Sequence, residues 1–141
     1  MRLATLIALM IAGVGFYATP GVAGTSTIAL PDCLGRPVAK PTSVTLACAD
    51  ANFRIERIQW TGWGESFAAG KGTGVVNDCE PSCVAGHFHN YPMLLIVTGR
   101  QTCPSGQTAY EKVVYAFVGP SPFPRESAKN ATQDFPCKPR P

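Results

Sequence analysis

The sequence predicts an all-β fold: a small, disulfide-stapled β-sandwich or barrel of about six to eight short strands, with irregular proline-rich ends. Short alternating or apolar segments recur between turn-forming residues. No segment carries an apolar stripe of helical period over a useful length. The six cysteines all follow residue 32, and an even count in a small exported domain is typical of a disulfide framework.

Residues 1–24 are predicted to be a secretory signal segment. One basic residue, Arg2, precedes an almost wholly apolar run over 3–16, and small residues lead us to expect cleavage after Ala23 or Gly24. An uncleaved anchor is the alternative, but the run is shorter than the ~20 apolar residues that a span needs. No later stretch is apolar enough to span a bilayer. We therefore expect a secreted or cell-envelope-associated protein without a transmembrane span in the mature chain.

The mature chain, 141 minus 24 residues, has the size of one domain. We expect a β domain over 25–119, with an extended arm over 25–41, and a proline-rich tail over 120–141 that Cys137 staples. Removing Arg2 lowers the net charge from +3 to +2, and the remaining basic residues are scattered as single residues. Without a basic patch, nucleic-acid binding is not expected.

The first predicted strand covers 43–48, where apolar and polar residues alternate, and 49–52 forms a turn. For the next stretch we favour a loop or turn followed by a strand over 57–63. A continuous strand is the alternative, and it would need a bulge near Glu56-Arg57 to keep all its apolar residues in the core.

Three glycines at alternate positions, Gly70, Gly72 and Gly74, allow two interpretations. On a strand they would leave one face as bare backbone, over which the indoles of Trp60 and Trp63 could lie flat. A flexible glycine loop is the alternative.

The segment over 77–92 is interpreted as a corner between two strands, in which Pro-Ser favours a tight turn between Cys79 and Cys83. The run over 91–98 leaves no polar face, so we expect a central strand covered on both sides. A further strand is predicted over 110–118.

The expected disulfides join the two cysteines of the corner, the two near strand ends and the two in the terminal arms: Cys79–Cys83, Cys48–Cys103 and Cys33–Cys137. The alternative keeps the first bond and pairs the other cysteines as Cys33–Cys48 and Cys103–Cys137.

Both histidines lie in the corner. On a strand, His87 and His89 would point to one side, and two imidazoles can hold Zn²⁺ or Cu²⁺ if a third ligand joins them. The chain has no third histidine, and no free cysteine if all six pair, so solvent-facing histidines are favoured and no cofactor is expected. The candidate binding residues are Trp60, Trp63, His87, His89 and Tyr91; an exposed indole of Trp60 or Trp63 would offer a binding platform, and a core position for both tryptophans is the alternative, which we favour. No catalytic constellation assembles, so no catalytic residue is predicted.

Three segments together resemble a group of small secreted proteins of actinobacteria: LACADAN at 46–52, WTGWG at 60–64 and NDCEPSCVAGHFHNYP at 77–92. The likeness covers about residues 44–98. It implies export and a paired-cysteine domain, and it transfers no site residue.

The favoured function is a non-enzymatic secreted or envelope domain that binds a protein or carbohydrate ligand. The alternatives are a small exported metal-binding protein or enzyme centred on His87 and His89, and a structural protein of the envelope.

Overall fold

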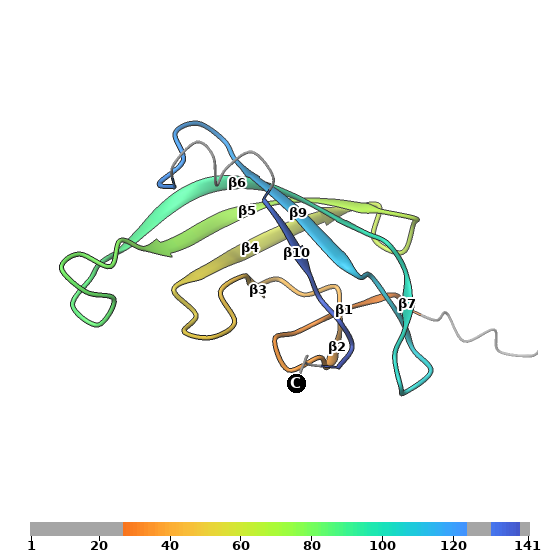
Figure 1. Cartoon of the computed structure of the whole chain (residues 1–141). Helices are drawn as coiled ribbons and strands as arrows, with labels where there is room; N and C mark the ends of the chain where they lie inside the picture. The colour runs from red at the N-terminus through yellow and green to blue at the C-terminus, as the bar shows by residue number, and fades with distance from the viewer. Residues whose placement is uncertain (1–26, 124–130, 139–141) are drawn as a thin grey trace, which may run out of the picture.

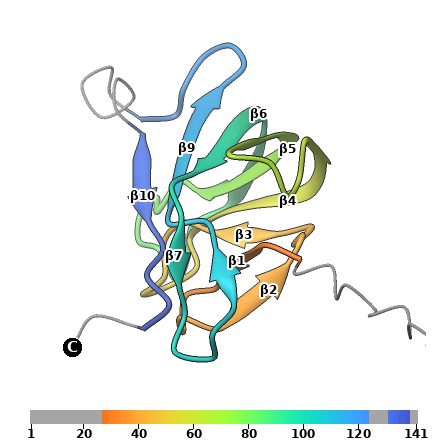
Figure 2. The ribbon, with the colours of Figure 1, turned by 90° about the vertical axis from the view of Figure 1, so that its right-hand side faces the viewer.

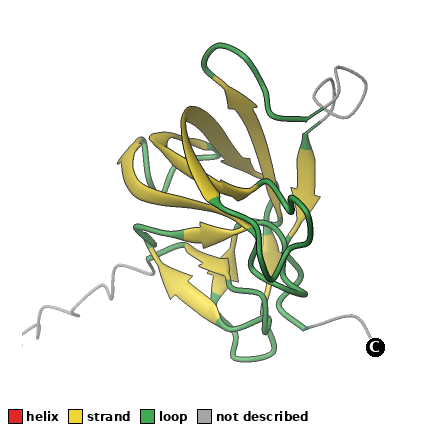
Figure 3. Ribbon diagram, turned by 90° about the vertical axis from the view of Figure 1, so that its left-hand side faces the viewer, coloured by secondary structure: helices red, strands yellow, loops and turns green. Residues whose placement is uncertain are grey.

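A computed structural model describes residues 27–123 and 131–138 of the chain. These ranges contain strands and loops without any helix (Figure 3), which confirms the all-β, disulfide-stapled class. It follows that the described part holds no helix long and apolar enough to cross a membrane. The predicted signal segment, 1–24, lies outside the described residues.

The strands form two sheets. The larger sheet has the order β10-β9-β6-β5-β4-β3, with every neighbouring pair antiparallel. Its strands are β3 (Val44–Thr45), β4 (Phe53–Thr61), β5 (Ala68–Asn77), β6 (Phe88–Thr98), β9 (Lys112–Phe117) and β10 (Thr132–Asp134). The smaller sheet has the order β2-β1-β8-β7. Its strands are β1 (Ala29–Pro31), β2 (Pro37–Ala39), β7 (Gln101–Thr102) and β8 (Thr108–Ala109).

The larger sheet curls into a half barrel, and its long strands arch over the short strands β1 and β2 of the smaller sheet (Figures 1 and 2). Side chains from the predicted N-terminal arm, Ile28 and Leu30, pack in one core with Ile55, Met93 and Val97 of the long strands. The side of the sheet that faces these short strands is called the inner face here, and the opposite side the outer face.

Strand β4 is continuous, so the expected loop followed by a strand over 57–63 is wrong and the bulged alternative is correct. The register with β5 shifts between Glu56 and Gln59, and Arg57 has a φ of 53°. The bulge turns the chain by one position, so that Ile55 and Ile58 are both buried, with 0% and 5% exposed.

The glycine run lies in strand β5. Its bare side faces inward and leaves room there for large side chains of β4. A Cβ at Gly70 would lie 2.9 Å from the Trp60 indole, so this indole covers the glycine as predicted. Trp63 does not join it, and packs on Trp60 with ring centroids 4.8 Å apart. At Gly72 the neighbours of a Cβ would be the Glu56 carbonyl oxygen and Ile55, both at 2.9 Å.

The corner disulfide Cys79–Cys83 is confirmed, but the other two expected pairings, Cys48–Cys103 and Cys33–Cys137, are wrong. The bonds formed are Cys33–Cys48 and Cys103–Cys137. Cys48 follows the edge strand β3, where the arm that carries Cys33 packs, whereas Cys103 follows β7 at the far edge of the smaller sheet. Each terminal arm is thus tied to the segment it packs against, and not to the other arm.

Residues 131–138 of the predicted C-terminal tail belong to the folded body, although the predicted domain ends at 119. Strand β10 pairs with β9, and the Phe135 side chain is buried in the main core with 3% exposed. The amide of Gln101 holds the tail, since its Nε2 donates to the Phe135 carbonyl at 2.6 Å and its Oε1 accepts from the Cys137 N–H at 3.1 Å.

Substituting Gly72→Ala is expected to lower the free energy of unfolding by about 1–3 kcal/mol, because the added methyl group overpacks the inner face against backbone. Thr73→Ala, on the same strand with its side chain on the outer face, serves as the control and should change stability much less. Urea denaturation of both variants measures the effect. Equal stability of Gly72→Ala and the wild type would contradict this packing.

Candidate functional site

The central strand β6 has one covered side and one open side. Met93, Leu95 and Val97 point inward and are at most 2% exposed, whereas Leu94 is 53% and Ile96 is 43% exposed. The expectation that this strand is covered on both sides is therefore wrong. The apolar run was correctly placed at the centre of the sheet, but only the inner face is packed.

The neighbouring strand extends the open apolar surface. In the register of β6 and β9, Leu94 lies opposite Ala116 and Ile96 opposite Val114, and the Val118 N–H donates to the carbonyl of Pro92. Cross-strand neighbours on one face lie about 4.5–5.5 Å apart, so these side chains form one continuous surface. We call it the outer-face patch: Pro92, Leu94, Ile96, Val114, Ala116 and Val118.

Cations border the outer-face patch on the side of β4 and β5. Lys71 lies directly opposite Leu94 in the β5–β6 register. A shallow hollow of about 470 Å³ places the side chains of Arg57, Gln59 and Lys71 beside Leu94 and Val118. Arg57 is well exposed, with 69% of its side chain accessible.

One acid lies close to this border. Glu56 accepts from Nε of Arg54 at 2.6 Å, and its second oxygen lies 3.9 Å from Arg57. Glu56 therefore offsets one of the three cations Arg54, Arg57 and Lys71, and the border keeps a net positive charge.

The two tryptophans, which were candidates for binding or for the core, are turned toward the interior. Nε1 of Trp60 donates to the carbonyl of Pro41 at 2.6 Å, and Nε1 of Trp63 donates to that of Ile28 at 2.9 Å. Both rings are half-buried against the main core, and Trp63 also meets Tyr110 edge-on. Their donors are already satisfied and their rings pack, so the two indoles form no shared flat platform on the surface.

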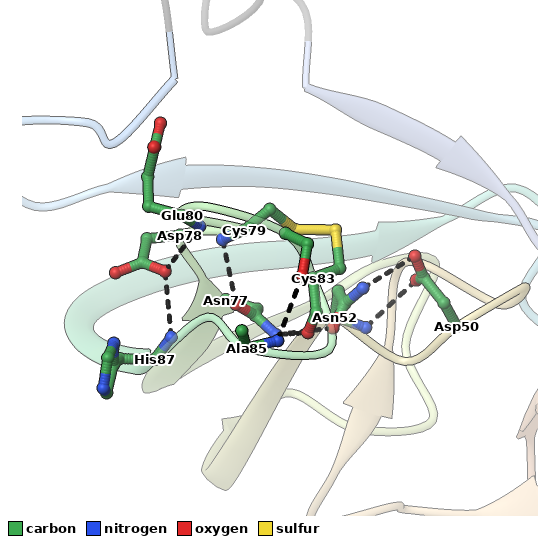
Figure 4. The surroundings of a disulfide bond; sticks show 10 residues. Asp50, Asn52, Asn77, Asp78, Cys79, Glu80, Cys83, Ala85 and His87 are labelled. Atoms are coloured by element: carbon green, nitrogen blue, oxygen red, sulfur yellow. Dashed lines mark hydrogen bonds between the residues drawn. A yellow bond between two sulfur atoms is a disulfide. The ribbon is translucent and has the colours of Figure 1, made fainter.

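The disulfide corner is organised by a buried asparagine (Figure 4). Nδ2 of Asn77 donates to Oδ1 of Asn52 at 3.0 Å and to the Cys83 carbonyl at 2.8 Å, while its Oδ1 accepts from the Cys79 N–H at 2.9 Å. The Asp50 carboxylate in turn accepts hydrogen bonds from the backbone N–H and the side-chain amide of Asn52. The corner is thereby fastened to the turn before β4.

Asp78 connects the corner to His87 and to His89 at the start of β6. Its Oδ1 accepts from the N–H groups of His87 and Glu80, at 2.9 and 3.1 Å, and its Oδ2 lies 2.8 Å from Nε2 of His89. The N–H of His87, the His89 imidazole and the N–H of Glu80 hold the pKa of the Asp78 carboxyl far below its usual range, because each stabilises the ionised form.

A recess of about 420 Å³ lies beside the corner and brings together two of the residues favoured for binding, His89 and Tyr91. The other lining side chains are Val76, Asn77, Asp78, Glu80, Pro122 and Phe123. His87 is exposed and does not line the recess. Within residues 27–123 and 131–138, no three His, Cys, Asp or Glu side chains gather as a metal site would require.

Sequence reasoning missed the outer-face patch and its cationic border. A continuous apolar run fits a doubly covered strand and a strand with an open apolar face equally well. The outward positions of the apolar run were therefore candidates for an open surface, even though the run has no polar face.

The Asn77→Ala substitution should lower the free energy of unfolding by about 1–3 kcal/mol, since it leaves the Cys79 N–H, the Cys83 carbonyl and Asn52 without their partner. Asn90→Ala, which removes an exposed amide from the adjoining strand, is the matched control and should be nearly neutral. Denaturant unfolding under oxidising conditions compares the two. A loss as small as that of the control would show that the network does not stabilise the corner.

The contribution of Asp78 should depend on pH in a definite direction. Because its folded pKa is depressed, its stabilisation is fully present above the unfolded pKa of about 3.9 and is lost as the pH falls through the folded value. Thermal midpoints of the wild type and Asp78→Asn, measured from neutral to strongly acidic pH, should differ most near neutrality and converge in acid. A difference that stays constant over that range would contradict the assignment.

No protein-family model, curated protein or solved structure matches this chain.

Proposed function

We propose that this chain is an exported, non-enzymatic β domain that binds a partner through the outer-face patch. The observation that carries the proposal is the exposure of Leu94 and Ile96 in the middle of the largest sheet. Single exposed apolar residues are ordinary on protein surfaces, but a continuous apolar patch with a charged border is typical of an interaction site.

The position of the patch strengthens this proposal. Leu94 and Ile96 belong to β6, which has β5 on one side and β9 on the other, so the backbone beneath them is held by two ladders of hydrogen bonds. A rigid support reduces the ordering entropy that binding would otherwise cost. The patch is thus pre-organised for contact, in contrast to an apolar side chain on a loop.

Export is supported by chemistry and by the resemblance to small secreted actinobacterial proteins. All six cysteines lie in disulfides, and such bonds persist in oxidising compartments. We therefore place the partner in the cell envelope or the surrounding medium.

The alternative centred on His87 and His89 has less support. Asp78, the acid nearest to His89, already accepts from two backbone N–H groups, and His87 lies apart from the recess. A carbohydrate partner at the tryptophans also loses support, because both indoles are turned inward.

Retention on envelope material tests the proposal. We expect the purified, oxidised mature chain to sediment with an envelope fraction, and the double variant Leu94→Ser/Ile96→Ser to remain in the supernatant. Leu34→Ser/Val38→Ser removes two exposed aliphatic side chains from the hairpin of β1 and β2, and this matched control should sediment like the wild type. Equal retention of both double variants would refute the outer-face patch as the binding surface.

A further inference from the structure

We propose that the partner of the outer-face patch is an anionic phospholipid surface, with apolar side chains of the patch entering the edge of the acyl region and the cations at its border meeting lipid phosphates. This inference rests on the proposed function and names the chemistry of the partner. The shape of the patch, its composition and its charge support it.

The shape favours a fluid partner over a rigid one. The patch lies on the convex side of the curled sheet (Figure 2), and the hollow at its border is shallow. A folded protein partner would need a matching concave surface to reach the close packing of a stable interface. A bilayer adapts to a convex apolar surface, because its lipids rearrange around inserted side chains.

The composition of the patch also favours a lipid partner. Its members are leucine, isoleucine, valine, alanine and proline, without tryptophan, tyrosine or a polar group at the centre. Protein interfaces obtain most of their binding energy from tryptophan, tyrosine and arginine anchors seated in pockets. The centre of the patch offers no aromatic anchor of this kind, whereas its aliphatic side chains contribute favourable transfer free energy in the interfacial region of a membrane.

The border supplies the charge complementarity. Arg57, Lys71 and Gln59 line one hollow beside Leu94 and Val118, so cationic groups and apolar side chains face the same direction. Glu56 offsets part of the charge of Arg54 and Arg57, whereas Lys71 has no ion-pair partner among the described residues. Basic side chains next to an inserted apolar surface bind the phosphates of anionic lipids.

A second copy of the chain fits the patch less well. Face-to-face packing would bring two convex surfaces together, and such surfaces bury little area. An anionic lipid surface adapts to the patch and also pairs with the cations at its border.

Vesicle sedimentation tests the inference, using the purified, oxidised mature chain. We expect binding to phosphatidylcholine vesicles in which phosphatidylglycerol replaces about a third of the lipid, little binding to phosphatidylcholine alone, and release as the salt concentration rises. Leu94→Ser/Ile96→Ser should weaken the partition coefficient at least about tenfold. Lys71→Gln should weaken it about fivefold.

Two matched controls separate the patch from general effects. Leu34→Ser/Val38→Ser removes exposed aliphatic surface elsewhere, and Lys40→Gln removes one exposed positive charge from the loop after β2; both should bind vesicles like the wild type. Circular dichroism and the urea midpoint establish that every variant is folded before binding is compared.

The outcomes distinguish this inference from the proposed function. Envelope retention that depends on the patch, without binding to anionic vesicles, would overturn the lipid partner and leave the docking role standing, with a protein as the occupant. Vesicle binding that is equal for Leu94→Ser/Ile96→Ser and its control would also overturn the inference. A loss of both envelope retention and vesicle binding in the Leu94→Ser/Ile96→Ser variant alone supports it.

Discussion

The architecture depends on how a short chain covers a large curled sheet. The six strands of that sheet present two faces, and among residues 27–123 and 131–138 the segments outside the sheet that join the core pack against its inner face. Ile28 and Leu30 from the N-terminal arm and Phe135 from the tail close the inner face, and two disulfides tie these arms to the segments beside them. In a small domain such covalent ties compensate for the limited buried area.

The inner face is shaped by backbone as much as by side chains. The glycines of β5 leave room for Trp60, Ile55 and Ile58, and the bulge in β4 turns both isoleucines inward. The large apolar side chains of β4 thereby all face the core. The outer face keeps Leu94 and Ile96 exposed above a well-paired backbone, which is the arrangement from which the docking role and its lipid partner are inferred.

The fold class followed from local patterns, because turn-bounded apolar segments indicate strands and an even number of cysteines in a small domain indicates disulfides. The corner bond Cys79–Cys83 was predictable for the same reason, since its two cysteines are near in sequence. The bonds of the arms were not, because they depend on which segments meet in space. A bulge was needed to assign 53–61 to one strand, and two-residue alternation cannot show a bulge without the partner strand.

The functional surface was hidden by a related ambiguity. A run such as 93–97 is apolar at inward and outward positions alike, so its pattern is the same for a doubly covered strand and for a strand with an open apolar face. The two cases differ only in which segments pack on the outward side, and this depends on the tertiary structure. For the tryptophans the sequence left a surface role and a core position open, and the Pro41 and Ile28 carbonyls accept their N–H groups inside the fold.

Carbene footprinting of the free, oxidised protein, read by mass spectrometry at single residues, tests the one-sided packing of β6. We expect alternation: strong labelling at Leu94 and Ile96, and protection at Met93, Leu95 and Val97. Uniform protection across 93–97 would show that the outer face is covered within the protein itself, and it would contradict both the open patch and the docking role assigned to it.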